Sequence, residues 1–130
     1  MRFILPFVLL VGSVAAAHAE PDLAKGEQVF KQCAACHAVG PDAKAKVGPP
    51  LNGIVGQKWA QFPGFSYSND LKTGGAAGKV WDEATLDASI ANPKAVAPQG
   101  RMPFGGIKNE ADRANLIAFL KQFSATGEKQ

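Results

Sequence analysis

The sequence predicts a small all-α domain in which about three to five helices and long irregular loops surround a large bound group. Apolar side chains recur at helical spacing near both ends of the chain, and no segment shows a convincing strand pattern. The 14 glycines and 9 prolines gather mainly in the long segments between the predicted helices. Because long loops seldom form a core of their own, a flat apolar group buried among them accounts for this pattern.

The first predicted helix follows Asp22, whose carboxylate can accept hydrogen bonds from the N–H groups of a first helical turn. Its apolar residues are spaced as on one helical face and are Gly26, Val29, Phe30 and Cys33. We therefore expect this helix to run into the cysteines.

Two further helices are predicted in the second half of the chain. Asp82 caps a helix over residues 83–91, which ends near Pro93 because proline disfavours helix in the residue before it. Asn109 caps the last helix, in which apolar residues recur at i, i+3, i+4 and i+7 as Leu116, Phe119, Leu120 and Phe123. A short helical turn is expected at residues 69–72.

The N-terminal segment has the character of a cleaved export signal. It begins with a positive charge, is almost wholly apolar from residue 3 to 17, and ends in the Ala-His-Ala sequence that a signal peptidase reads. The alternative is a retained N-terminal anchor, but Pro6 and Gly12 interrupt the apolar run. The sequence therefore predicts a signal peptide over residues 1–19 and a single domain over residues 20–130.

Length, charge and hydropathy exclude several classes of protein. A chain of 130 residues suits one compact domain. The net charge is +3, and Arg2 of the leader contributes one unit, so the remaining +2 is too small to indicate nucleic-acid binding. No apolar run outside the leader reaches the roughly 20 residues that span a bilayer. We expect neither a nucleic-acid partner nor stable membrane insertion.

Cys33, Cys36 and His37 form the sequence C-x-x-C-H, which is the attachment signature of c-type haem. Each thiol can add across one haem vinyl group, and the adjacent imidazole can then coordinate the iron. A thioredoxin-like redox pair would need a βαβ pattern, and a zinc site would need about four ligands. A structural disulfide without haem is the remaining alternative.

Outside the leader, His37 is the one histidine and Met102 the one methionine. If His37 coordinates one side of an iron, the other side is left to Met102, a lysine amine, water or no ligand at all. An isolated methionine is usually core filler. Met102, however, lies in a loop rich in Gly and Pro at residues 99–106, which favours a ligand.

The sequence resembles the class I c-type cytochromes, particularly mitochondrial cytochrome c and its soluble bacterial periplasmic relatives. The resemblance covers residues 23–123. It rests on the motifs Gly26, Phe30, Cys33-Ala34-Ala35-Cys36-His37, Gly48-Pro49-Pro50-Leu51, Pro63-Gly64-Phe65-Ser66-Tyr67-Ser68, Trp81, Asn92-Pro93-Lys94, Met102 and Leu116-Ile117-Ala118-Phe119-Leu120. It implies the small cytochrome c fold around one covalently bound haem c. It also implies that the first helix crosses the last, with Gly26 and Phe30 against Leu116 and Phe119.

The resemblance also implies roles for single residues. Cys33 and Cys36 would anchor the haem covalently, and His37 and Met102 would be the axial ligands of its iron. The Pro49 carbonyl would accept the free N–H of His37, which fixes the orientation of the imidazole and makes it a stronger donor.

Tyr67 and Trp81 would donate hydrogen bonds to a haem propionate. The chain departs from the mitochondrial pattern at Gln57, Leu71 and Ser89, where that pattern has Arg, Asn and Tyr. These departures change the polar surroundings of the haem.

An iron coordinated on both sides has no open position for O2 or peroxide, so the resemblance implies a periplasmic one-electron carrier rather than an enzyme. It would move electrons from a membrane or periplasmic donor to a terminal oxidase, reductase or photosynthetic reaction centre. Such partners would dock transiently at the exposed haem edge of a monomer. The basic residues expected to steer them are Lys31, Lys94, Arg101 and Lys108.

An alternative function is a haem-based peroxidase-like enzyme or ligand sensor. That function requires Met102 to be a labile sixth ligand or to lie away from the iron.

Overall fold

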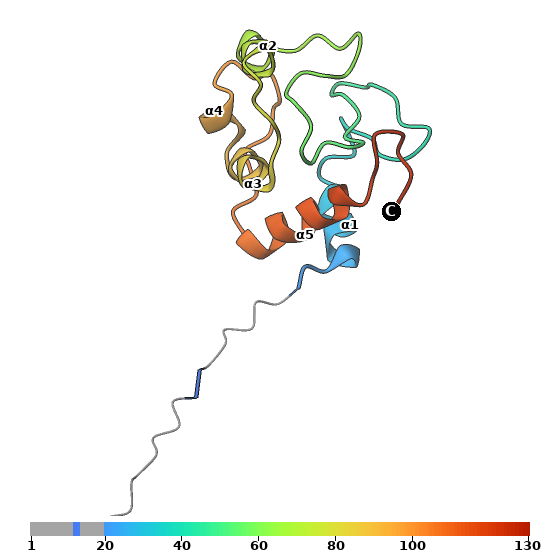
Figure 1. Cartoon of the computed structure of the whole chain (residues 1–130), viewed down its shortest axis with the longest axis vertical. Helices are drawn as coiled ribbons and strands as arrows, with labels where there is room; N and C mark the ends of the chain where they lie inside the picture. The colour runs from blue at the N-terminus through green and yellow to red at the C-terminus, as the bar shows by residue number, and fades with distance from the viewer. Residues whose placement is uncertain (1–11, 14–19) are drawn as a thin grey trace, which may run out of the picture.

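The computed structural model describes residues 12–13 and 20–130, and apart from Gly12 and Ser13 the predicted leader lies outside the described residues. The described part contains the helices α1 (Leu23–Phe30), α2 (Asn69–Ala76), α3 (Glu83–Ala91), α4 (Pro93–Val96) and α5 (Glu110–Lys121). It has no strand, only the isolated antiparallel bridges Lys58–Val80 and Phe123–Lys129. The predicted all-α class with three to five helices is confirmed (Figure 1).

The crossing of α1 and α5 forms the largest part of the packed core. A Cβ atom on Gly26 would lie 2.1 Å from the backbone oxygen of Asn115 and 2.8 Å from the Cβ of Phe119, so no larger residue fits there. The rings of Phe30 and Phe119 pack with centroids 5.3 Å apart. The Asp22 N–H donates to Asn115 Oδ1 at 2.8 Å, which ties the start of α1 to α5.

The first helix ends earlier than the sequence predicts. The regular helix stops at Phe30, so Cys33 lies in the turns that follow rather than on the helix. The N–H groups of Cys33 and Ala34 both donate to the Phe30 carbonyl, at 2.8 and 3.0 Å, and His37 N–H donates to the Cys33 carbonyl at 2.8 Å. Apolar spacing continues through these turns, which is why the pattern did not mark the end of the helix.

The predicted turn at residues 69–72 is the start of a longer helix, α2, which runs to Ala76. Glycine weakens helices, and α2 contains both Gly74 and Gly75. A Cβ on Gly74 would lie 2.3 Å from the ring of Trp59, and one on Gly75 would lie 2.2 Å from the Trp59 carbonyl oxygen. Close packing on Trp59 therefore explains both glycines, and tertiary contacts override their low helix propensity.

The caps of α3 and α5 are those that the sequence predicts. Asp82 accepts from the Thr85 N–H at 2.7 Å, and Asn109 accepts from the Asp112 N–H at 3.0 Å. Helix α3 ends at Ala91 as expected, but the chain then forms α4, which the sequence analysis did not predict. Proline is favourable at the first position of a helix because its missing N–H has no partner there.

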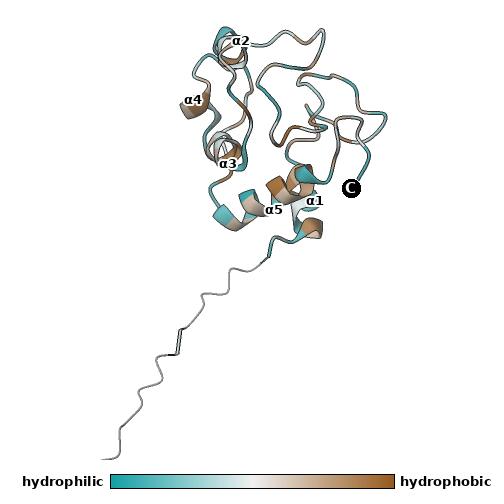
Figure 2. Cartoon of the chain, in the orientation of Figure 1, coloured by the Kyte–Doolittle hydropathy of each residue, from teal (hydrophilic) through white to brown (hydrophobic). Residues whose placement is uncertain are grey.

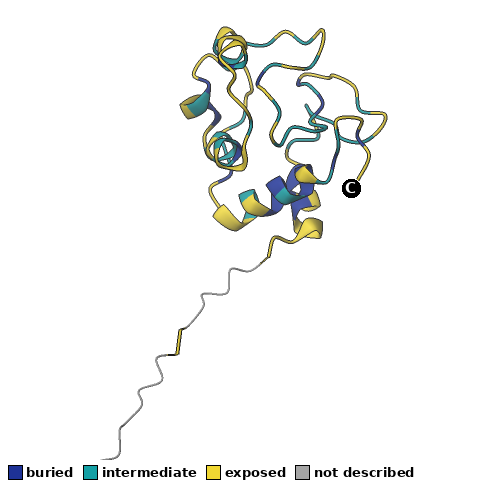
Figure 3. Ribbon diagram, in the orientation of Figure 1, coloured by how far each residue is buried: buried dark blue, intermediate teal, exposed yellow. Residues whose placement is uncertain are grey.

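The helices leave a wide region of loops between them. Figure 1 shows α1 and α5 crossing at one end of the molecule, with α2, α3 and α4 along one side and the loops of residues 37–68 opposite them. Hydrophobic residues gather where α1 and α5 meet (Figure 2). Buried residues concentrate at the same crossing, while the loops are largely half-buried or exposed (Figure 3). The loops thus pack around a space rather than around a core of their own.

Candidate cofactor site

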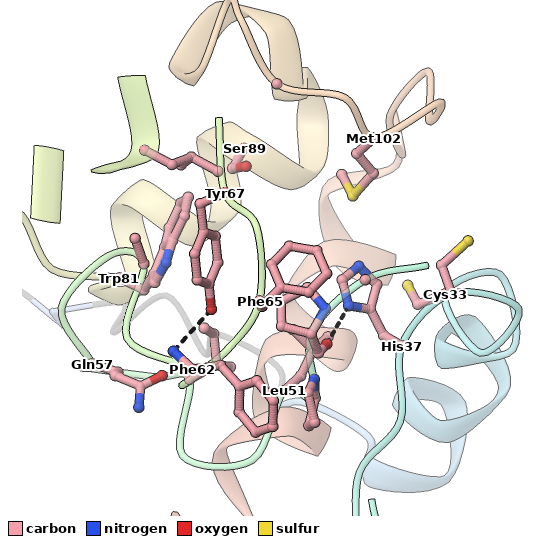
Figure 4. A pocket seen from close by; sticks show the side chains of 18 of the residues that line it. Cys33, His37, Leu51, Gln57, Phe62, Phe65, Tyr67, Trp81, Ser89 and Met102 are labelled. Atoms are coloured by element: carbon pink, nitrogen blue, oxygen red, sulfur yellow. Dashed lines mark hydrogen bonds between the residues drawn. The ribbon is translucent and has the colours of Figure 1, made fainter. Parts of the chain in front are cut away.

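The loops and helices enclose a cavity of about 1020 Å³. Its walls come from the segment 32–68, from α3, from the segment 97–104 and from α5. Most of the exposed wall is apolar, and Cys33, Cys36, His37 and Met102 all line it. The structure therefore brings the residues of the C-x-x-C-H motif and the distant methionine to one space (Figure 4).

The His37 ring is held in one orientation. Its Nδ1 donates to the Pro49 carbonyl at 2.7 Å, which leaves the lone pair of the other ring nitrogen, Nε2, available to a metal (Figure 4). A Cβ on Gly48 would lie 2.4 Å from the imidazole, so glycine is needed beside the ring. Burial lowers the pKa of His37, although the Pro49 hydrogen bond opposes this. A neutral imidazole is the form that coordinates iron.

The two cysteines lie in consecutive turns between α1 and His37. Cys36 N–H donates to the Cys33 carbonyl at 3.1 Å, and both thiols are free and half-buried. Burial raises the pKa of Cys33, and electrostatic repulsion from the nearby Cys36 raises it further. Lys46 donates from Nζ to the Ala34 carbonyl at 3.1 Å, inside the same turn. Lys46 is not among the basic residues expected from the sequence, which are Lys31, Lys94, Arg101 and Lys108.

Met102 lies on a loop that is tied to the rest of the molecule on both sides. The Gln99 N–H donates to Asp70 Oδ2 at 2.8 Å, across 29 residues of sequence. The Arg101 guanidinium donates to the Ser66 carbonyl. These contacts connect the Met102 loop to the start of α2 and to the loop before it.

The far end of this loop is fixed by backbone contacts to α3. The Ile107 N–H donates to the Ile90 carbonyl at 2.9 Å. A Cβ on Gly106, whose φ is +102°, would lie 2.0 Å from the Ala91 oxygen. Arg113 also joins this end of the loop to α3, because its guanidinium forms an ion pair with Asp87 at 2.7 Å and donates to the Ile107 carbonyl at 3.1 Å.

Tyr67 and Trp81 line the cavity away from Cys33 and His37, as Figure 4 shows. The Tyr67 hydroxyl oxygen accepts from the Phe62 N–H at 2.9 Å, so its own O–H remains free to donate. Burial raises the pKa of Tyr67, and the Phe62 hydrogen bond opposes this rise. A phenol that stays protonated keeps an O–H that can donate a hydrogen bond.

Gln57, Leu71 and Ser89, where the chain departs from the mitochondrial pattern, also line the cavity. Of the four basic residues expected to steer partners, Lys94 and Arg101 line the cavity, whereas Lys31 and Lys108 do not. All four side chains are exposed.

Sequence reasoning missed two residues near this site. Trp59 is buried, with 4% of its surface exposed, and its ring stacks on that of Trp81. Asp70 holds the Met102 loop through Gln99. The only signal for Trp59 was that it is one of two tryptophans in the chain, and nothing local marks Asp70.

Among the helices of the described residues, none combines the length and the apolar character that a membrane crossing requires.

Comparison with known proteins gives consistent matches along the chain. A sequence model of the family Cytochrome c matches residues 23–124. The chain is 56% identical to a cytochrome c2 from Rhodomicrobium vannielii over 106 residues, or 82% of each chain. It is 44% identical to a cytochrome c2 from Blastochloris viridis over 129 residues, which cover 99% of this chain and 98% of the relative.

The fold has a counterpart of similar sequence among solved structures. The structure of cytochrome c2 from Rhodospirillum centenum superposes with a TM-score of 0.73 at 40% identity. The match covers 79% of this chain and 98% of that one.

Proposed function

The chain belongs to the cytochrome c family, and we propose from its cavity how it performs the one-electron transfer of that family. It is an electron carrier whose cofactor is one covalently attached haem c. The single observation that supports the ligand assignment best is that His37 and Met102 line the same apolar cavity, with Nδ1 of His37 already engaged by Pro49.

The residues present fit this cofactor. Two free thiols lie in the turn beside the imidazole, so both could form thioethers while His37 coordinates the iron. The cavity offers a mostly apolar wall to a flat ring, including Leu51, Phe65 and other side chains of the loops. When bound, the haem supplies an iron that accepts and releases one electron.

Residues of the chain orient this haem and set its reduction potential. The Pro49 carbonyl holds the His37 ring in one tautomer and strengthens Nε2 as a donor. The Met102 thioether would hold the iron on its other side and, because a thioether favours ferrous iron, would raise the reduction potential. Tyr67 and Trp81 would donate hydrogen bonds to a haem propionate and so offset its negative charge, which disfavours the reduced state.

The proposed function is that of a carrier and not of an enzyme, because His37 and Met102 line one cavity and would together hold the iron, which would leave no open position for a substrate. The ties from Asp70 and Arg101 to the Met102 loop support this, since they oppose release of the methionine. A peroxidase-like enzyme or ligand sensor would need that loop to open.

The chain is exported by the leader at residues 1–19 and works as a monomer in the periplasm. Its donor is a membrane or periplasmic redox protein, and its acceptor is a terminal oxidase, reductase or photosynthetic reaction centre. The exposed Lys94 and Arg101 lie at the cavity and steer acidic partners, and Lys31 and Lys108 extend the positive surface. Such steering weakens as the salt concentration rises.

Replacing Met102 tests the ligand assignment. Met102→Ala is expected to lower the midpoint potential and to let cyanide bind the ferric protein, because the sulfur ligand is lost. Spectroelectrochemical titration of the haem-loaded protein, followed by cyanide addition, measures both effects.

Leu23→Ala is the matched control, because Leu23 is also an exposed apolar residue, 45% exposed, and does not line the cavity. It should leave the potential and the response to cyanide unchanged. If Met102→Ala kept the wild-type potential and still excluded cyanide, Met102 would not be the ligand.

A further inference from the structure

Trp59 lies one layer behind the cofactor cavity. Its ring and that of Trp81 are stacked, with centroids 4.7 Å apart and an interplanar angle of 25°. Trp81 lines the cavity, and Trp59 does not. Trp59 is the more deeply buried of the two, so it supports the back of the Trp81 ring.

Backbone pairing fixes the positions from which both rings project. The Trp59 N–H donates to the Lys79 carbonyl at 2.9 Å, and the Trp81 N–H donates to the Gln57 carbonyl at 2.7 Å. These bonds flank the isolated bridge between Lys58 and Val80. The stack therefore rests on a defined register between two segments that are 22 residues apart at the two tryptophans.

The other side of Trp59 is fixed by α2. Gly74 and Gly75 let this helix approach so closely that a Cβ at either position would collide with Trp59. The Lys79 ammonium lies 5.0 Å from the centroid of the Trp59 ring. Trp59 is thus enclosed between α2 and Trp81 and has little room to shift.

The described contacts of the Trp59 ring are made by its face. Within the described residues, its Nε1 is buried and has no hydrogen-bond partner. An unpaired buried N–H is unfavourable, so the residue is explained by the flat face of its ring. A phenyl ring could supply such a face without the unpaired donor.

We propose that Trp59 is a positioning residue that holds the Trp81 indole against the cofactor and thereby contributes to the reduction potential. This inference rests on the proposed function, in which Trp81 donates to a haem propionate. Loss of the stack lets the Trp81 ring turn away from the propionate. The uncompensated negative charge then stabilises the ferric state and lowers the potential.

A double-mutant cycle tests whether Trp59 acts through Trp81. The variants are Trp59→Leu, Trp81→Phe and the double variant, with Trp59→Phe as the conservative rescue. The midpoint potential of each haem-loaded protein is measured at one pH and one salt concentration. The thioether-to-iron absorption band is followed in parallel, so that a change in Met102 ligation is detected separately.

Trp59→Leu is expected to lower the potential with the thioether band intact, and Trp59→Phe to stay near the wild-type value. In the Trp81→Phe background, Trp59→Leu is expected to add little further shift in the potential, because the Trp81 indole that Trp59 positions is already absent. Equal shifts of Trp59→Leu in both backgrounds, or no shift in the wild-type background, would overturn the proposal.

The cycle also separates this proposal from the proposed function. If Trp81→Phe lowers the potential and Trp59→Leu does not, the propionate role of Trp81 stands and only the positioning role of Trp59 falls. If Trp81→Phe changes nothing, the propionate role itself is wrong, and the positioning role falls with it.

Gly74→Ala keeps the test decisive if Trp59→Leu does not fold. The added methyl group would displace the Trp59 ring while both tryptophans remain, and alanine favours helix more than glycine does. A lowered potential is expected, whereas the exposed Thr73→Ala on the same helix should leave it unchanged. A wild-type potential in Gly74→Ala would contradict the positioning role.

Discussion

At the scale of the residue, the His37 imidazole is set by two neighbours that follow it in the sequence. The Pro49 carbonyl fixes which nitrogen carries the proton, and the absent side chain of Gly48 gives the ring its space. The Gly-Pro-Pro segment therefore specifies the orientation of the proposed iron ligand through one hydrogen-bond acceptor and one steric requirement.

Gly48→Ala is expected to destabilise the protein and to impair haem attachment, because the new methyl group would lie 2.4 Å from the His37 ring. Overpacking of this kind typically costs about 1–3 kcal/mol in the free energy of unfolding. Denaturant unfolding and the pyridine haemochrome yield measure the two effects. Gly105→Ala is the control because a Cβ there meets nothing within 4 Å, and equal behaviour of the two variants would refute the steric argument.

The hydrogen bond from the Gln99 N–H to the Asp70 carboxylate holds the Met102 loop in a way that depends on pH. The pKa of Asp70 is lowered by hydrogen bonds, first from the Ser68 hydroxyl and then from the N–H groups of Gln99 and Leu71. A carboxylate with a lowered folded-state pKa stabilises the fold above its ordinary pKa of 3.8, and this contribution is lost as the pH falls through the lowered value.

The stability difference between the wild type and Asp70→Asn should therefore be constant near neutral pH and shrink in acid. Unfolding curves of the haem-loaded proteins at several pH values below 5 measure it, with the exposed Asp42→Asn as the control. A difference that stays constant down to the acid transition would contradict the role of the Asp70 carboxylate.

At the scale of the element, the caps could be predicted from the sequence because they depend on contacts three residues apart. Asp82 and Asn109 each accept from the N–H of the third residue that follows. The length of α2 could not be predicted, because it depends on Trp59, which packs on Gly74 from outside the helix. Local patterns therefore give the starts of α3 and α5 and the end of α3 before Pro93, whereas the extent of α2 depends on tertiary contacts.

The Asn109 cap is expected to stabilise α5 and, through it, the crossing with α1. Asn109→Ala should lower the free energy of unfolding by about 1 kcal/mol, because the Asp112 N–H loses its acceptor. Asn109→Ser should retain most of the stability, since serine also caps helices. Guanidinium unfolding of the three proteins measures this, and equal stability of Asn109→Ala and wild type would rule out the cap contribution.

At the scale of the whole molecule, the site combines one local motif with residues that only the fold brings together. Cys33, Cys36 and His37 are adjacent in sequence, so their chemistry was evident before the structure was known. Met102 could be proposed as a ligand because the sequence from residue 20 onward has no other methionine. The role proposed for Trp59 could not be predicted, because it depends on a stack with Trp81, 22 residues away, and on close packing against α2.

The irregular loops lack an apolar core of their own because they surround the cavity. Among residues 20–130, the main apolar core lies at the α1–α5 crossing, and the loops surround a space of about 1020 Å³. A buried porphyrin would remove much of the apolar wall from water. A haem bound there would lie among apolar side chains, and such surroundings disfavour the extra positive charge of the ferric state.

The optical spectrum of the haem-loaded ferric protein, before and after addition of cyanide, shows whether His37 and Met102 both hold the iron. If they do, the spectrum is low-spin, with a thioether-to-iron charge-transfer band that short exposure to cyanide does not change. A high-spin spectrum without that band, converted rapidly by cyanide, would contradict this ligation by removing Met102 from the iron and opening a coordination position.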